Sequence, residues 1–156
     1  MRREAVACYG LRSRCMVVIN KFIEKMIANE RTGHVQPKNT VYRLTTLVEL
    51  QSLLELADER VVLLDFTATW CGPCKKLLPM VHQLASRYSN ELLVCEVDVD
   101  EAPEVVNHHN VNAMPTFIFY RRKMPFHRIT GVTMSILEST TSLAVKAVFP
   151  STVEFE

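Results

Sequence analysis

The order of apolar and polar positions changes its period several times between residues 41 and 150. Short runs rich in β-branched and aromatic residues predict strands at residues 41–44, 61–67, 92–97, 116–120 and 126–130. Stretches with apolar residues three and four positions apart predict helices at residues 47–57, 71–88, 103–109 and 134–148. The run at 61–67 is almost continuously apolar, which is typical of a central strand covered on both faces. This alternation predicts an α/β domain in which a mixed β-sheet is flanked by helices on both faces.

The first 40 residues follow a different pattern. Residues 16–27 predict an amphipathic helix whose apolar face carries Ile19, Phe22, Ile23, Met26 and Ile27. Gly33 and Pro37 end this pattern, and residues 31–40 are interpreted as a linker. We therefore predict an N-terminal extension at 1–40, one domain at 41–150 and a C-terminal tail at 151–156. The extension is interpreted as an added helix or a frayed tail. The alternative is a mitochondrial presequence, which its arginines favour and its glutamates oppose.

Charge separates the same two parts of the chain. Residues 1–40 hold eight Lys or Arg and three Glu, a net charge of +5, whereas the remainder holds ten basic and fourteen acidic residues, a net charge of −4. An acidic body lacks the concentrated basic face that phosphate binding requires, so no nucleic-acid partner is expected. Apolar residues make up 48% of the chain, which excludes disorder over most of it. The longest apolar runs are far too short to span a membrane.

The five cysteines do not have the number or spacing of a small disulfide scaffold. Because no clear secretory signal precedes them, we expect a reducing compartment, and hence a cytoplasmic location. Cys8 and Cys15 fall in the extension, and Cys95 is interpreted as a small buried apolar residue in a strand. No second ligand pair stands at a zinc-binding spacing, so no metal is expected. The pair His108-His109 is expected at the solvated end of a short helix.

The remaining two cysteines lie in the sequence WCGPCK at residues 70–75, directly after the apolar strand and at the start of a helix. Cysteines three apart at a helix start lie on one face, close enough to form a disulfide. The unpaired N–H groups and positive dipole end at that position are expected to lower the pKa of Cys71. Pro73 suits the first helical turn, and Gly72 leaves the loop open to an approaching substrate.

This arrangement predicts dithiol–disulfide exchange. The Cys71 thiolate attacks a substrate disulfide and forms a mixed disulfide, after which Cys74 attacks Cys71 and releases the reduced substrate. Cys71 is thus the expected nucleophile and Cys74 the resolving cysteine, with Gly72 and Pro73 tuning the redox pair. The chain has no dinucleotide fingerprint, so no bound cofactor is expected beyond the Cys71–Cys74 disulfide itself.

Three stretches together resemble the thioredoxin family, particularly its eukaryotic cytosolic type. They are VVLLDFTATWCGPCK at 61–75, EVDVDEAPE at 96–104 and MPTFIF at 114–119, and the resemblance covers roughly residues 41–149. It implies the thioredoxin fold and the reduction of disulfide-containing proteins, with a contribution to electron transport and cell redox homeostasis. It also implies recharging by an NADPH-dependent thioredoxin reductase.

The resemblance assigns further site residues. Asp65 would be a buried carboxylate beneath Cys74 that takes the Cys74 proton through water, and burial would raise its pKa. Pro115 would be a cis-proline facing the two cysteines, exposing backbone groups that pair with an extended substrate. Trp70 would cover the disulfide and contact partners, and Gly131 would lie near the substrate groove.

The sequence departs from the family pattern at several positions. Glu96 stands where many bacterial members have Lys, and two adjacent carboxylates would raise the apparent pKa of one of them. The basic segment 121–123 and the following Met-Pro replace a usual glycine turn, which predicts a different turn type. Two alternatives to reductase activity remain: a redox-gated binding module, and an oxidase or isomerase. The Gly-Pro pair between the cysteines argues against oxidase or isomerase activity.

Overall fold

The computed structural model describes residues 41–147; residues 1–40 and 148–156 lie outside the described part. The expectations for the extension and for the C-terminal tail therefore fall outside the described residues. Within the described part, nine elements follow one another: β1 Val41–Arg43, α2 Leu47–Ala57, β2 Val61–Thr67, α3 Gly72–Arg87, β3 Leu92–Asp98, α4 Pro103–His108, β4 Thr116–Arg121, β5 Met124–Thr130 and α5 Met134–Lys146.

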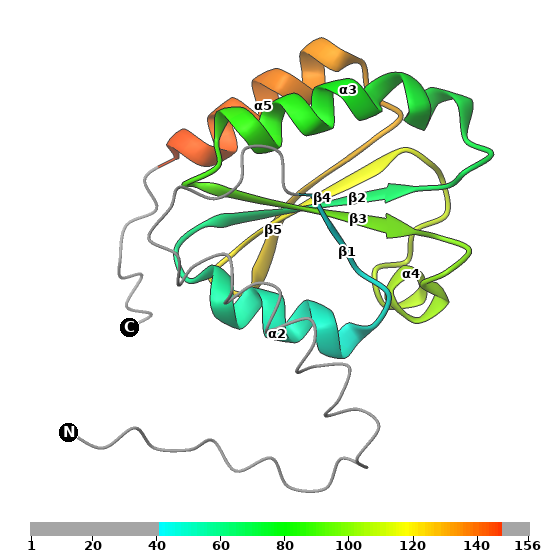
Figure 1. Cartoon of the computed structure of the whole chain (residues 1–156), viewed down its shortest axis with the longest axis horizontal. Coiled ribbons are helices and arrows are strands. Elements are labelled where there is room, and N and C mark those ends of the chain that lie inside the picture. Colours follow the sequence, from blue (N-terminus) through cyan, green and yellow to red (C-terminus); the bar gives the residue numbers. More distant parts are fainter. Residues whose placement is uncertain (1–40, 148–156) are drawn as a thin grey trace, which may run out of the picture.

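The five strands form one mixed sheet in the order β1-β3-β2-β4-β5. Strands β1, β3 and β2 are parallel, whereas β4 runs antiparallel to β2 and β5 antiparallel to β4. Helices α3 and α5 cover one face of the sheet, and α2 and α4 cover the other (Figure 1). The predicted α/β architecture is confirmed, and the arrangement is the thioredoxin fold.

Strand β2 occupies the centre of the sheet, and six of its seven residues are buried. Its side chains alternate between two apolar clusters. Val61 and Leu63 join the cluster under α3 and α5, and Val62 and Leu64 join the cluster under α2 and α4. Burial on both faces explains the almost continuous apolar run. It also fixes the carboxyl end of β2, from which the chain leads into α3.

The β4–β5 hairpin differs from its predicted form. Arg121 pairs with Met124, so the turn contains only Arg122 and Lys123, and both have positive φ values of 49° and 66°. Two such residues are the pattern of a type I′ turn, which matches the twist of a hairpin. Pro125 belongs to β5, which is an edge strand where a missing N–H is tolerated.

The expectation that both histidines are solvated is wrong for His109. His109 is 9% exposed; its Nδ1 lies 2.7 Å from the carbonyl oxygen of Val105, and its Nε2 lies 2.7 Å from the hydroxyl of Tyr120. Burial is the main cause that lowers the pKa of His109. The side chain of Cys95 is fully buried with a free thiol, as expected, and burial raises its pKa. Within residues 41–147, no helix has the length and apolar character needed to cross a membrane.

Candidate active site

Cys71 and Cys74 are joined in a disulfide where β2 leads into α3. Their Cα atoms lie 5.3 Å apart, so the two predicted cysteines are brought together in the oxidised state. Cys71 is the N-cap of α3, and its Sγ accepts a hydrogen bond from the backbone N–H of Cys74 at 3.2 Å. Pro73 stands in the first turn, where its missing N–H leaves no bond unmade. The sulfur of Cys71 therefore lies at the positive end of a 16-residue helix, where a negative charge is stabilised.

One side of the disulfide is open. Cys71 and Cys74 are only 5% and 6% exposed, but the intervening Gly72 and Pro73 are both exposed. A Cβ built on Gly72 would meet no atom within 4 Å. The space over Gly72, one of the two residues between the cysteines, is therefore free of other protein atoms.

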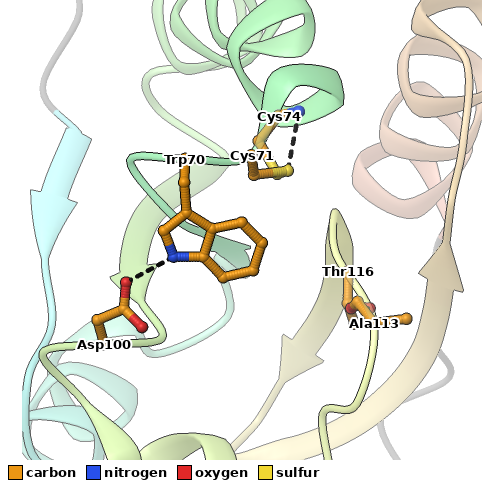
Figure 2. Close-up of a disulfide and its surroundings, with 6 residues drawn as sticks. All are labelled: Trp70, Cys71, Cys74, Asp100, Ala113 and Thr116. Atoms are coloured by element: carbon orange, nitrogen blue, oxygen red, sulfur yellow. Dashed lines mark hydrogen bonds between the residues drawn. A yellow bond between two sulfur atoms is a disulfide. The ribbon is translucent and has the colours of Figure 1, made fainter.

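Trp70 lies next to the disulfide and is 65% exposed. Its Nε1 donates a hydrogen bond to Oδ2 of Asp100 at 2.9 Å, as Figure 2 shows. The backbone N–H of Asp100 in turn donates to Oδ1 of Asp98. These bonds hold a large apolar side chain at the surface beside the redox pair. Sequence reasoning missed the role of Asp100, although it lies within the quoted segment at 96–104.

The loop before β4 contacts the disulfide from another direction. The Met114–Pro115 peptide bond is cis, as the resemblance implied, and Met114 packs against the cluster that contains both cysteines. The hydroxyl of Thr116 donates to the carbonyl oxygen of Ala113 at 2.7 Å and so links the residues on either side of Met114 and Pro115. Figure 2 shows where Ala113 and Thr116 lie relative to the disulfide. The Gly131 N–H donates to the carbonyl oxygen of Pro115 at 2.9 Å. With a φ of 63°, Gly131 adopts a conformation that favours glycine.

Asp65 is the buried acid of the site. It lies in β2, is 4% exposed, and its Oδ1 has no hydrogen-bond partner among the described residues. Burial, and secondly the charge of Glu96, raise the pKa of Asp65 to about 7. The expected effect of Glu96 is therefore confirmed: Glu96 is the register partner of Asp65 on the neighbouring strand β3.

A small cleft of about 170 Å³ reaches this region, and Cys74, Glu96 and Thr67 are among its lining residues. This volume is below the range of about 300 Å³ or more that is usual for small-molecule sites. Within residues 41–147, no group of three or more His, Cys, Asp or Glu side chains is placed to hold a metal ion.

Comparison with known proteins agrees with this geometry. The sequence model of the thioredoxin family matches residues 45–141. A thioredoxin of Gallus gallus is 38% identical over 94 residues, covering 60% of this chain and 89% of that protein.

Solved structures give the same result. Fasciola hepatica thioredoxin matches with a TM-score of 0.63 and 33% identity, covering 65% of this chain and 97% of that one. The oxidised mitochondrial thioredoxin 3 of Saccharomyces cerevisiae matches with a TM-score of 0.60 and 32% identity, covering 65% and 93%. The fold, the disulfide at the start of α3 and these similarities agree: this chain belongs to the thioredoxin family of dithiol–disulfide oxidoreductases.

Proposed function

We propose that this protein reduces protein disulfides with Cys71 as the nucleophile and Cys74 as the resolving cysteine. In the reduced protein, the Cys71 thiolate attacks one sulfur of a substrate disulfide, and the other substrate sulfur leaves as a thiolate. The Cys74 thiolate then attacks Cys71 and displaces the second substrate thiolate. Two electrons pass to the substrate, and the Cys71–Cys74 disulfide forms. The observation that carries this order is the N–H of Cys74 directed at Sγ of Cys71.

Asp65 is the proposed acceptor of the Cys74 proton. A general base is most effective when its pKa lies near the working pH, and the pKa of Asp65 is about 7. Its neighbour Glu96 lines the same cleft as Cys74, which supports a short route between the carboxylate and the thiol. The cleft has room for a water molecule that would relay the proton.

The proposed substrate-binding residues are Trp70, Pro115 and Gly131. The residues proposed to tune the redox pair are Gly72 and Pro73. Trp70 is exposed beside the disulfide. The backbone hydrogen bond from Gly131 to Pro115 holds the loop whose Met114 packs against the cysteines. The open space over Gly72 supports an extended substrate segment crossing the cysteines between these two sides.

In the cell, the proposed partners are disulfide-containing proteins and an NADPH-dependent thioredoxin reductase, which returns electrons to the Cys71–Cys74 disulfide. This places the protein in electron transport and cell redox homeostasis. We propose that residues 41–150 form the thioredoxin domain, with residues 1–40 and 151–156 as appendages. The proposed location is the cytoplasm, and the alternative is the mitochondrion if residues 1–40 are a presequence. Sequencing the native N-terminus in isolated organelles separates the two.

A trapping experiment tests the order of the cysteines. Reduced Cys74→Ser protein is mixed with a disulfide substrate, and mixed disulfides are mapped by mass spectrometry. We expect the substrate on Cys71, because no resolving thiol remains to release it. Cys95→Ser in the same background is the matched control, since Cys95 is fully buried. Equal trapping on Cys74 in the Cys71→Ser protein would reject the assignment. Non-covalent recovery of partners by a protein lacking both cysteines would instead favour a binding module.

A further inference from the structure

Three side chains form one row across three neighbouring parallel strands. Arg43 of β1 is the register partner of Glu96 on β3, and Glu96 is the register partner of Asp65 on β2. Register partners in adjacent strands point to the same face of a sheet. Val94 and Leu63 lie two residues before Glu96 and Asp65 on their strands, and both belong to the cluster under α3 and α5. The row therefore lies on the face of the sheet that α3 covers.

From the surface inward, this row holds one cation followed by two carboxyl groups. Arg43 donates from one guanidinium nitrogen to Oε1 of Glu96 at 3.1 Å, and its other terminal nitrogen lies 3.6 Å from Oε2 of Glu101. The side chain of Arg43 is 59% exposed and that of Glu96 is 22% exposed, whereas Asp65 is almost fully buried. The hydrogen bond to Glu96 is the largest cause of a raised pKa of Arg43.

The same row reaches the redox cysteines. Arg43 and Glu96 both line the small cleft that also contains Cys74. Other charged groups on this cleft are Asp98, at the end of β3, and Lys75, at the start of α3. From the other side of β2, strand β4 places the uncharged Phe117 opposite Asp65. Glu96 is thus the charged group directly beside Asp65 in the sheet, and Arg43 is the group that holds Glu96.

We propose that Arg43 is a positioning residue for the redox site, which holds the Glu96 carboxylate at the outer side of the row and so limits the negative charge acting on Asp65. The inference rests on the proposed role of Asp65 only for its consequence in catalysis. Without Arg43, the charge of Glu96 is neither compensated nor drawn outward. Asp65 then keeps its proton to a higher pH, and less of it is available as a base for Cys74 at neutral pH.

The direct test is the titration of the Asp65 carboxyl, followed by NMR of 13C-labelled aspartate in the oxidised protein. We expect Arg43→Gln to raise the pKa of Asp65 by about half a unit, the effect of the Glu96 charge moving roughly 1 Å nearer to Asp65 from a separation of about 6 Å. Glu96→Gln should lower it. Arg43→Lys should restore most of the wild-type value, because the cation is kept. Arg87→Gln is the control; Arg87 is also an exposed arginine paired with a glutamate, but it lies 13 residues beyond Cys74 in α3, about 20 Å away.

A double-mutant comparison shows whether Arg43 acts through Glu96. In the Glu96→Gln background, the shift caused by Arg43→Gln should fall to less than half. An equal shift in both backgrounds would mean that Arg43 acts directly on Asp65, and it would overturn the proposal. An unchanged pKa of Asp65 in Arg43→Gln, or the same shift in Arg87→Gln, would overturn it as well. Urea unfolding confirms that each variant is folded, and Arg43→Met, which keeps an unbranched side chain but removes the charge, replaces Arg43→Gln if that variant does not fold.

The pH profile of insulin-disulfide reduction separates this inference from the function of Asp65. If Asp65 is the base, Arg43→Gln should move the pH dependence of the reduction rate to higher pH by the same amount as it raises the pKa of Asp65. If Asp65→Asn leaves the rate unchanged, the proposed role of Asp65 fails, but the titration still decides whether Arg43 sets its charge through Glu96.

Discussion

The backbone N–H of Cys74 donates a hydrogen bond to Sγ of Cys71, the N-cap of α3. The spacing of the two cysteines, the start of the helix and the stabilisation of a thiolate are therefore one structural feature. An N-cap side chain accepts a hydrogen bond from a first-turn N–H, and the sulfur of the proposed nucleophile fills that position. Replacing Cys71 therefore changes the stability of α3 as well as removing the redox pair.

This relationship predicts different stabilities for two inactive variants. Cys71→Ser keeps an acceptor at the N-cap, whereas Cys71→Ala removes it. We expect Cys71→Ala to unfold with a free energy about 1 kcal/mol lower than that of Cys71→Ser. Both variants lack the disulfide, so urea unfolding compares them on equal terms. Identical free energies of unfolding would show that the cap bond contributes nothing to stability.

Asp65 should make the protein less stable at alkaline pH. The native carboxyl keeps its proton up to about pH 7, whereas its ordinary pKa is 3.8, so the native state binds more protons between these values. The free energy of unfolding therefore falls as the pH rises through this window. Asp65→Asn removes the group that causes this fall. The change in the free energy of unfolding caused by Asp65→Asn should therefore be more favourable at pH 8 than at pH 4, by about 4 kcal/mol at most. Urea unfolding of the oxidised protein at the two pH values checks this, and an effect independent of pH would contradict it.

His109 should have the opposite dependence on pH. Its pKa is lowered in the native state, chiefly by burial, so protonation favours the unfolded chain. Its contribution to stability is present above the unfolded pKa of about 6.5 and is lost as the pH falls below it. Wild type should therefore lose stability as the pH falls below about 6.5, and His109→Gln should lack this part of the loss. Thermal unfolding of both proteins across this range is the measurement, with His127→Gln, an exposed histidine, as control. Parallel curves for wild type and His109→Gln would disprove the assignment.

The two site glycines should respond differently to alanine. Gly131 has a φ of 63°, and a Cβ there meets no atom, so the cost of Gly131→Ala is backbone strain of about 1–2 kcal/mol. Gly72 has neither a left-handed conformation nor a close neighbour, so Gly72→Ala should not lower the free energy of unfolding. Measuring both variants by urea unfolding is sufficient. If Gly72→Ala lowered the free energy of unfolding more than Gly131→Ala, backbone strain at Gly131 would not be the deciding factor.

The centre of the fold could be predicted from the sequence because its signals are local. A continuous apolar run, a Cys-X-X-Cys segment and a first-turn proline lie within 15 residues, and each depends on its immediate neighbours. The cis bond before Pro115 came from the family resemblance, since a proline at the start of a strand gives no such signal alone. The partnership of Trp70 with Asp100 crosses 30 residues and has no local signal.

The residues that the sequence could not place are those whose environment depends on strand register. Arg43 and Glu96 are 53 residues apart and meet only because β1 and β3 pair in parallel at one register. His109 follows a short helix, where polar residues are usually solvated, but it is drawn inward by Tyr120 of β4. The shortened turn at Arg122 and Lys123 depends on the pairing of Arg121 with Met124.

The most direct test of the account is the rate of insulin-disulfide reduction by wild type and by Cys71→Ser, with dithiothreitol or a thioredoxin reductase supplying electrons. We expect wild type to accelerate the reaction and Cys71→Ser to fall to the uncatalysed rate, because serine cannot form the mixed disulfide. Cys95→Ser should keep the wild-type rate, since Cys95 is fully buried. Equal rates for wild type and Cys71→Ser would contradict the account.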